Sequence, residues 1–435
     1  MIKTVSIHWF RRDLRLQDNA ALYHALKAGL PLVPIFIFDT NILNKIEDKR
    51  NLQVSFIYQQ VKRLHQELQN MGSTLEVYYG SPEEVFSLLA KKYNLKSVYT
   101  NNDYESYARL RDAKVSDLLL AQGIQFYSYK DQVIFEKDEV VKDDQKPYTV
   151  FTPYSKKWKS KLNDFYVSPY DVDKYLVNLH KQTPYALPCL ESMGFELHLL
   201  DYPTQYLQAS VLATYHETRD FPAIEGTSRL GVHLRFGTIS IRNLVSEASS
   251  STNEVFMNEL IWREFYQCIT WHFPHIGRGE AFKIKYDGIK WRNIESEFAR
   301  WQEGQTGYPM VDAGMRELNA TGFMHNRVRM VCASFLSKHL LIDWRWGEAY
   351  FESKLLDFDF AANNGGWQWA SGSGCDAAPY FRVFNPSLQA KKFDPQLTYI
   401  RRWVAEFQEF TYPKPMVDHA AARLRALDAY ATALK

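Results

Sequence analysis

Short apolar runs alternate with amphipathic stretches over the first 130 residues. The runs are rich in β-branched and aromatic residues and too short for helices, so each predicts a buried strand. They are Thr4–Phe10, Leu32–Phe38, Thr74–Tyr79, Ser97–Thr100 and Gln125–Tyr129. Amphipathic stretches lie between them, among them Asn51–Met71 and Ser106–Gln122. Because strands that alternate with helices form parallel sheets, we expect a Rossmann-like α/β domain over residues 1–130.

The pattern changes twice in the rest of the chain. Residues 131–205 are charged, interrupted by prolines and irregular, which predicts a long connector packed over the surface. From residue 206 to 435 helical periodicity dominates, with breaks at glycine and proline, and the Ala- and Leu-rich segment after Pro413 predicts a terminal helix. The expected fold is therefore an α/β parallel-sheet domain followed by an all-α domain.

The predicted sheet domain lacks the glycine-rich signatures of nucleotide binding. Its first strand runs into His8-Trp9-Phe10-Arg11-Arg12 without a G-x-G-x-x-G turn, and the sequence contains no G-x-x-x-x-G-K-[ST]. We therefore expect the main cofactor to be held elsewhere in the chain.

Composition excludes few classes of protein. Hydrophobic residues make up 46% and charged residues 23%, as in ordinary soluble enzymes. The net charge of +2 decides nothing about nucleic acid, because a binding groove needs local positive charge. The four scattered cysteines favour neither disulfides nor a metal site. Without a signal peptide or a long apolar stretch, we expect a cytoplasmic protein that does not enter a membrane.

Tryptophan is concentrated in the second half of the chain. Nine of the eleven tryptophans follow residue 260, and four form the pairs Trp344-Arg-Trp346 and Trp367-Gln-Trp369. The pairs flank Asp357–Trp369, which mixes carboxylates, amides and glycines. Because an indole can stack on a flat base and carry an electron, this pattern predicts a site for planar, redox-active partners. The alternative is that these tryptophans only fill the hydrophobic core of a helical domain.

Two further segments combine residues suited to binding. Thr227, Ser228 and Arg229 lie at an expected helix start, where they can cradle a phosphate or simply cap the helix. Glu259 and Trp262 are three residues apart and share a helix face, so that together they can bond a base edge and stack on its ring.

A third segment runs from Met324 to Met330. Asn326 and Met330 are four apart, with Arg327 beside them, and we expect Arg329 to point to another face. The set suits a polar pocket with one soft apolar wall, and a core methionine with two surface arginines is the alternative.

Taken together, these segments resemble the photolyase/cryptochrome family, most closely its class I cyclobutane pyrimidine dimer photolyases. The resemblance covers essentially the whole chain and is most specific between residues 305 and 403. The matching segments are IHWFRRDLRLQDNAAL, EGTSRLGVHLRFGTIS, ELIWREFYQ, TGYPMVDAGMRELNATGFMHNRVRMVCASFL, LLIDWRWGEAYF, DFDFAANNGGWQWASGSGCDAAPYFRVFNP and DPQLTYIRRWV.

This resemblance implies one noncovalent FAD, folded into a U shape in the helical domain. The positions that match the family's cofactor-binding residues are Tyr215, Thr227, Ser228, Arg229, Leu230, Gly231, Arg263, Arg329, Asp357, Asp359 and Asn363. Arg329 would pair with Asp357, and Asn363 would face the flavin N5. An amide at that position is similar to photolyases, whereas plant-type cryptochromes have aspartate there and animal cryptochromes cysteine.

The resemblance also implies light-driven repair, in which excited reduced FAD passes an electron to a flipped-out pyrimidine dimer. Trp367, Trp344 and Trp291 would form the chain that feeds electrons to the flavin, and Glu259 would stabilise the dimer radical. The positions that would meet the DNA are Arg219, Glu259, Trp262, Asn326, Arg327, Met330 and Trp369.

Two points stay open at this stage, the function within the family and the antenna chromophore. A cryptochrome-type photoreceptor and a (6-4) photolyase are alternative functions. Relatives carry a folate, a deazaflavin or a flavin as a second, antenna chromophore, or carry none. Neither the Asn101–Glu105 loop nor the Ile42–Asn51 loop selects among these alternatives. The expected partner is DNA that contains pyrimidine dimers, with no obligate protein partner and a monomeric state.

Overall fold

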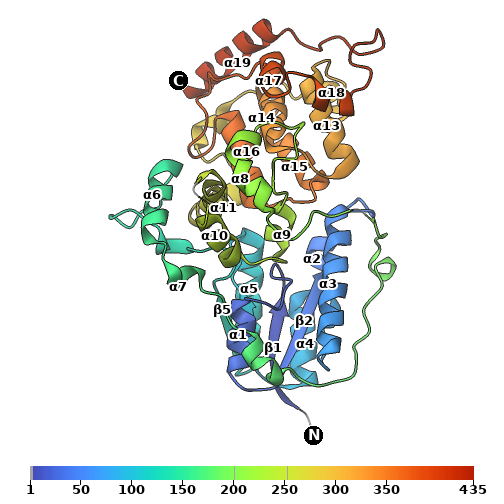
Figure 1. Ribbon diagram of the computed structural model, residues 1–435, viewed down its shortest axis with the longest axis vertical. Coiled ribbons are helices and arrows are strands. Elements are labelled where there is room, and N and C mark those ends of the chain that lie inside the picture. Colours follow the sequence, from blue (N-terminus) through green and yellow to red (C-terminus); the bar gives the residue numbers. More distant parts are fainter. Residues whose placement is uncertain (1–2, 200, 252) are drawn as a thin grey trace. The chain divides into compact units, whose positions relative to one another are not determined.

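The computed structural model describes residues 3–199, 201–251 and 253–435 (Figure 1). The chain folds into two compact units, a sheet unit and a helical unit. The sheet unit comprises Met1–Glu139, Ser160–Tyr206 and Arg229–Ser250. The helical unit comprises Val140–Lys159, Leu207–Ser228 and Ser251–Lys435. The division of the chain at residues 130 and 205 stays a prediction.

Five parallel strands form the core of the sheet unit, in the order β3-β2-β1-β4-β5. They are β1 (Thr4–Phe10), β2 (Leu32–Asp39), β3 (Glu76–Gly80), β4 (Asn94–Asn101) and β5 (Gln125–Tyr129). Every residue of β2 is buried, which accounts for its continuous apolar sequence. All five predicted strands are confirmed, and only the ends of β2, β3 and β4 differ by a few residues.

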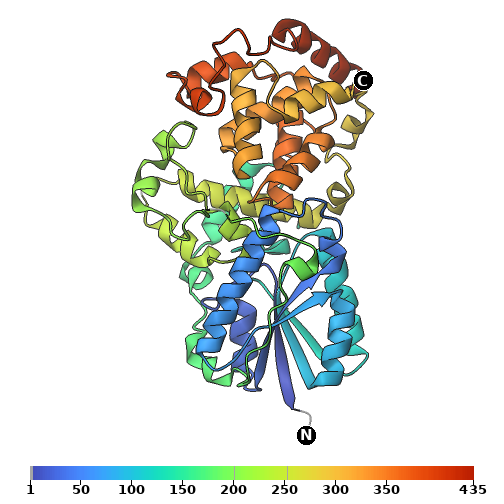
Figure 2. The same ribbon diagram turned by 90° about the vertical axis from the view of Figure 1, so that its right-hand side faces the viewer.

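Helices cover both faces of this sheet. The α-helices of the unit are α1 (Ala20–Lys27), α2 (Thr40–Leu43), α3 (Leu52–Asn70), α4 (Pro82–Lys92), α5 (Ser106–Leu120), α7 (Asp164–Val167), α9 (Gly231–Phe236) and α10 (Ile241–Ser249). Right-handed crossovers place α1 and α3 on one face and α4 and α5 on the other, as Figure 2 shows. The predicted helices Asn51–Met71 and Ser106–Gln122 are confirmed as α3 and α5. Short 3-10 helices lie at Lys137–Glu139, Asp173–Asn178 and Glu191–Met193.

The helical unit confirms the predicted all-α half. Its α-helices are α6 (Phe151–Lys161, of which the last two residues belong to the sheet unit), α8 (Ala209–Thr218), α11 (Val255–His272), α12 (Glu295–Gln302), α13 (Pro309–Thr321), α14 (Asn326–Ser334), α15 (Trp344–Lys354), α16 (Phe360–Ser371), α17 (Pro386–Phe393), α18 (Thr398–Trp403) and α19 (His419–Leu434). Pro274–Arg278 and Ile284–Gly288 are 3-10 helices, and Phe335–His339 is a π-helix. The helix predicted after Pro413 is α19.

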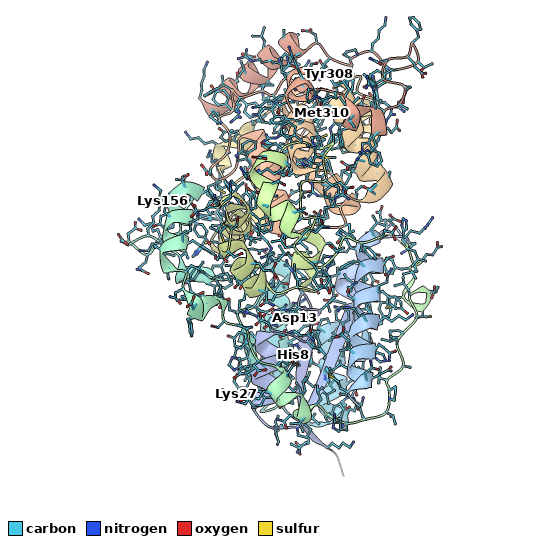
Figure 3. All side chains as sticks on the ribbon, in the orientation of Figure 1. His8, Asp13, Lys27, Lys156, Tyr308 and Met310 are labelled. Atoms are coloured by element: carbon cyan, nitrogen blue, oxygen red, sulfur yellow. The ribbon has the colours of Figure 1, made fainter. Side chains whose placement is uncertain are left out.

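One large apolar cluster forms the core of this unit. Tyr308 and Met310 from the start of α13 belong to it (Figure 3), as do the buried indoles of Trp301, Trp344 and Trp367. None of the four cysteines forms a disulfide among the described residues, and Cys268, Cys332 and Cys375 are buried. Within the described parts of the chain, no helix combines the length and apolar character needed to cross a membrane.

Helix α6 is a correction, because an irregular connector was expected there. Tyr154 and Trp158 are one helical turn apart, and both are buried. Their side chains donate hydrogen bonds to the carboxylate of Glu264 in α11. This packing outweighs the lysines and the proline that suggested a loop, while Lys156 on the same helix is exposed (Figure 3).

Candidate functional site

One cavity of the helical unit gathers many of the residues predicted for the site. Its volume is about 130 Å³. Its lining includes seven predicted residues: Asn326, Arg329, Met330, Asp357, Asp359, Asn363 and Trp367. Its apolar walls come from Ala333, Phe351, Leu355, Phe358 and Ala362. Polar groups and one indole therefore share this cavity with apolar side chains.

Helix α14 supplies one wall of this cavity. The side chain of His325 caps the helix by accepting a hydrogen bond from the Arg327 amide at 3.2 Å. Asn326, Arg329 and Met330 then share one face and line the cavity together. The expectation that Arg329 points to another face was wrong, because positions three apart are neighbours on a helix. Arg327 donates instead to Asp220 at 2.7 Å.

Two aspartates before α16 are held by partners on other helices. Arg329 Nη2 donates to both carboxylate oxygens of Asp357, at 2.9 and 3.0 Å, which confirms the predicted pairing. Asp359 caps α16 by accepting from the Ala362 amide, and it also accepts from Gln267 Nε2 at 3.2 Å. Gln267 lies on α11 and was missed, since its pairing joins segments that are 92 residues apart.

A buried acid lies beside Asn363. Asn363 Nδ2 donates to the backbone carbonyl of Glu348 at 3.2 Å, and Asn364 Nδ2 donates to the Glu348 carboxyl at 2.8 Å. Burial raises the pKa of Glu348 to about 7, against the lowering effect of the Asn364 hydrogen bond. Sequence reasoning missed Glu348, although it stands one helical turn after Trp344 in α15.

The predicted electron-transfer tryptophans all join the core of the helical unit. Trp344 and Trp367 are buried in it, and Trp291 is partly buried against it. Gly347 makes room for Trp367, because a Cβ there would lie 2.0 Å from Trp367 Cη2. Trp344 and Trp367 therefore fill the core, as the alternative interpretation expects, and Trp291 packs at its edge. Their role in electron transfer stays a prediction.

The residues predicted to meet DNA have partners within the same unit. Glu259, with about 31% of its side chain exposed, forms an ion pair with Arg219. Burial raises the pKa of Glu259, and the charge of Arg219 opposes that shift. Trp262 stacks on Phe151 with ring centroids 3.8 Å apart. The ring centroids of Trp369 and Phe384 are 6.3 Å apart.

Each of the predicted phosphate-binding residues belongs to one of the two units. Helix α9 begins at Gly231, as expected from the sequence. Tyr215 in α8 meets the ring of Phe256 edge-on at 5.2 Å. Thr227 and Ser228 belong to the helical unit, whereas Arg229, Leu230 and Gly231 belong to the sheet unit. Arg263 lies on α11. The binding role of these residues stays a prediction.

The cavity has features that fit a bound aromatic cofactor such as FAD. Nε1 of Trp367, which lines the cavity, is buried and has no hydrogen-bond partner among the described residues. The same holds for Oε1 of Gln267, whose Nε2 donates to the cavity residue Asp359. Unpaired buried polar atoms are costly, and a ligand with its own donors and acceptors can satisfy them. An added Cβ at Gly366, on the cavity wall, would meet no atom within 4 Å.

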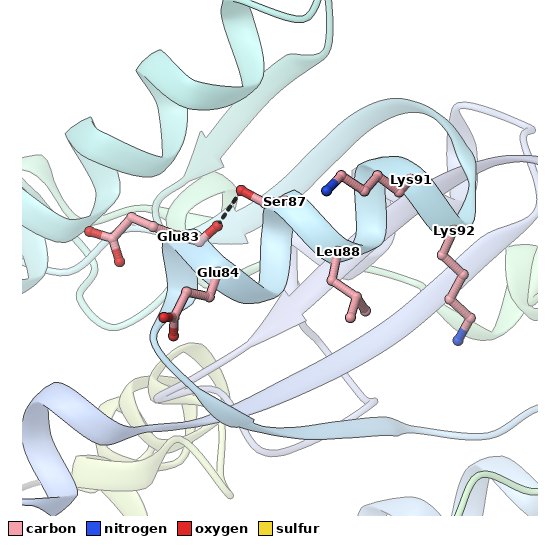
Figure 4. Close-up of a pocket in the computed structure, with 6 residues that line it drawn as sticks. All are labelled: Glu83, Glu84, Ser87, Leu88, Lys91 and Lys92. Carbon is pink, nitrogen blue, oxygen red and sulfur yellow. Dashed lines mark hydrogen bonds between the residues drawn. The ribbon is translucent and has the colours of Figure 1, made fainter.

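A larger hollow, of about 790 Å³, lies elsewhere and is a poor candidate site. It runs along α4 of the sheet unit, and Figure 4 shows its six lining residues on that single helix. Glu83, Leu88 and Lys91 are typical of a solvated helix face, and the Ser87 hydroxyl donates to the Glu83 carbonyl at 2.8 Å. No converging set of buried polar groups is present among these six residues, so we place the functional site in the helical unit.

Comparison with known proteins assigns both units to one class of flavoprotein. A family model described as DNA photolyase matches residues 6–172, and one described as the FAD-binding domain of DNA photolyase matches residues 256–411. The chain belongs to the DNA photolyase family.

Full-length relatives support this assignment. The chain is 37% identical to the deoxyribodipyrimidine photo-lyase of Vibrio cholerae, over 98% of this chain and 99% of that protein. The structure of a class III photolyase from Agrobacterium tumefaciens aligns with a TM-score of 0.88 at 33% identity, covering 100% of this chain and 98% of the other. A Synechocystis cryptochrome aligns with a TM-score of 0.85 at 27% identity, covering 99% of each chain.

Proposed function

We propose that this protein is a light-driven DNA lyase that splits cyclobutane pyrimidine dimers and carries one noncovalent FAD. The observation that carries the proposal is the cavity that joins Asn363, the Arg329–Asp357 pair and Trp367 within a FAD-binding domain. Bound there, reduced FAD would supply, on excitation by blue light, the electron that opens the dimer ring and returns afterwards.

The chain's own residues would hold the cofactor and set its charge. Arg329, Asp357 and Asp359 would bind its polar edges, and Asn363 would face the flavin ring with an amide that cannot ionise. Tyr215, Thr227, Ser228, Arg229, Leu230, Gly231 and Arg263 would bind the rest of the molecule. Trp367, Trp344 and Trp291 would pass electrons inward when the flavin is oxidised.

The DNA side of the site would read the lesion by stacking and by hydrogen bonds. Photolyases are among the enzymes that take their target out of the base stack. Trp262 and Trp369 would stack on the flipped dimer, and Asn326 and Met330 would line its pocket. Glu259 would hydrogen-bond the dimer and stabilise its developing charge, as preorganised polar groups do. Arg219 and Arg327 would contact phosphates and fix the register on DNA.

Further parts of the proposal concern the rest of the molecule. We assign an antenna chromophore, a folate, a deazaflavin or a flavin, to the sheet unit. An archaeal photolyase from Sulfolobus tokodaii with two FAD molecules aligns with a TM-score of 0.83 at 33% identity, over 98% of this chain and 99% of that one. The protein would act as a cytoplasmic monomer without an obligate protein partner, with domains at 1–130, 131–205 and 206–435.

Repair of a defined oligonucleotide tests the function. Purified protein with reduced FAD is incubated with DNA that carries one cyclobutane thymine dimer, in blue light and in the dark. We expect light-dependent restoration of the two thymines, and none in the dark. The structural likeness to the Synechocystis cryptochrome supports a second candidate, a photoreceptor. Flavin photoreduction without any repair of single- or double-stranded substrate would favour that candidate and contradict the lyase.

A further inference from the structure

The indole of Trp262 lies against a second aromatic ring from a distant part of the chain. The ring centroids of Phe151 and Trp262 are 3.8 Å apart, and the ring planes differ by 4°. The two residues are 111 positions apart in sequence, on α6 and α11 of the helical unit. One face of the Trp262 indole is thus covered by a parallel ring.

Phe151 is itself held in place from two sides. Its backbone N–H donates to Asp376 Oδ2 at 3.0 Å. Its helix α6 is fixed to α11 because the side chains of Tyr154 and Trp158 both donate to Glu264, an acid that is 3% exposed. Glu264 lies two residues after Trp262, so the same short stretch of α11 carries the anchor and the stacked indole. These contacts fix the backbone position from which the Phe151 ring reaches the indole.

We propose that Phe151 is a positioning residue for lesion recognition, which fixes the Trp262 indole as a preformed platform for the dimer. This inference rests on the proposed function, in which Trp262 stacks on the flipped bases. A stacked partner on one face orders the indole during folding, so DNA binding no longer has to order it. The lesion then adds a third layer to an existing stack of two rings.

A support and a gate differ in their effect on the preference for damaged DNA. A gate would occupy the place of the lesion and would move aside when DNA binds. Phe151 begins a helix that two buried hydrogen-bonding side chains fix to α11, so its ring extends from a fixed backbone position, as a support requires. The two roles predict opposite signs: losing a support weakens the preference for damaged DNA, whereas losing a gate strengthens it.

Substitutions that separate ring stacking from apolar volume test the inference. Phe151→Leu keeps an apolar side chain and removes the ring, and Phe151→Tyr keeps the ring. Phe410→Ala, which removes a fully exposed phenylalanine, serves as the control. FAD content and the midpoint of thermal unfolding are measured for each variant. If Phe151→Leu fails to retain FAD, Phe151→Met provides a second ring-free side chain.

The primary readout is the ratio of affinities for an oligonucleotide with one thymine dimer and for the same sequence undamaged. We expect Phe151→Leu to lower this ratio roughly two- to tenfold, the range that the loss of one aromatic pair predicts. Phe151→Tyr and Phe410→Ala should keep the wild-type ratio. The repair quantum yield of Phe151→Leu at saturating substrate should equal that of the wild type, because Phe151 does not act on the electron.

A double-mutant cycle shows whether Phe151 acts through the indole. In a Trp262→Ala background, Phe151→Leu should change the ratio no further. If Phe151→Leu still lowered the ratio in the Trp262→Ala background, Phe151 would have its own contact with DNA. If the single variant Phe151→Leu raised the ratio, Phe151 would be a gate. Either result overturns the inference.

A further outcome concerns the proposed function itself. If wild-type protein shows no preference for dimer-containing DNA, the proposed function fails at that measurement, and the inference fails with it. A normal wild-type preference that Phe151→Leu leaves intact rejects the inference alone.

Discussion

Arg329 and Asp357 form a two-bond ion pair that ties α14 to the turn before α16, with Nη2 to oxygen distances of 2.9 and 3.0 Å. Arg329 Nε also donates to the Met324 carbonyl at 2.7 Å, so the guanidinium is fixed on two sides. The pair lies in the wall of the proposed cofactor cavity and combines a structural role with a binding role.

Asp357→Asn should therefore weaken both folding and cofactor retention. The substitution leaves a partly buried guanidinium without its counter-charge, which we expect to lower the free energy of unfolding by about 1–3 kcal/mol. The measurements are the midpoint of denaturation and the molar ratio of FAD to protein. Glu280→Gln is the matched control, because it breaks the exposed Arg278–Glu280 pair and should cost less than about 1 kcal/mol. If Asp357→Asn and Glu280→Gln lowered the ratio of FAD to protein equally, the assignment of Asp357 to the cofactor would be contradicted.

The buried tryptophans allow a test that separates packing from electron transfer. Trp344→Phe and Trp291→Phe should slow photoreduction of oxidised flavin by at least tenfold and leave repair by pre-reduced enzyme nearly unchanged. The proposed chain feeds the cofactor and takes no part in opening the dimer. Flash photolysis and a repair assay measure the two activities separately.

Trp403→Phe controls for the loss of an indole from the same core, against which Trp403 packs. This variant should retain both activities. A parallel fall of photoreduction and repair in Trp344→Phe would show that Trp344 matters through packing alone.

Much of the fold followed from local pattern. The strands of the sheet are short apolar runs between amphipathic helices, and that alternation survives in the structure with small differences at the ends. The Arg329–Asp357 pair was also predicted, because family resemblance links two motifs that local pattern alone does not connect. The two hydrogen bonds between Arg329 and Asp357 confirm that long-range pairing.

Other parts of the site depend on contacts that no local pattern shows. Gln267 reaches Asp359 across 92 residues, and Phe151 reaches Trp262 across 111. Helix α6 forms in a lysine-rich segment because Tyr154 and Trp158 donate hydrogen bonds to the buried Glu264 of α11. These two contacts and helix α6 depend on tertiary packing, which residue propensity does not predict.

Glu348 provides a pH-dependent prediction. Burial raises its pKa to about 7 in the folded state, above the ordinary value of 4.5. The folded protein thus binds more protons than the unfolded chain between these values, and stability falls as pH rises from about 4.5 through 7. Glu348→Gln should remove this part of the pH dependence, so that the two proteins differ in the slope of unfolding free energy against pH. Identical slopes between pH 5 and 8 would contradict a raised pKa.

Asn363 offers the sharpest test of which branch of the family this site resembles. Its side chain is about 9% exposed and lines the cavity, and its Nδ2 donates to the Glu348 carbonyl at 3.2 Å. Asn363→Asp replaces an amide that cannot ionise by an acid that can exchange a proton with the flavin and that loses the donor to Glu348. We expect the variant to retain FAD but to lose the fully reduced form several-fold faster in air, measured from the flavin absorption after photoreduction.

Asn385→Asp is the matched control, since Asn385 caps α17 and aspartate caps a helix equally well. Unchanged lifetimes in both variants would remove Asn363 from control of the flavin, whereas a shortened lifetime in Asn363→Asp alone supports its place beside the ring.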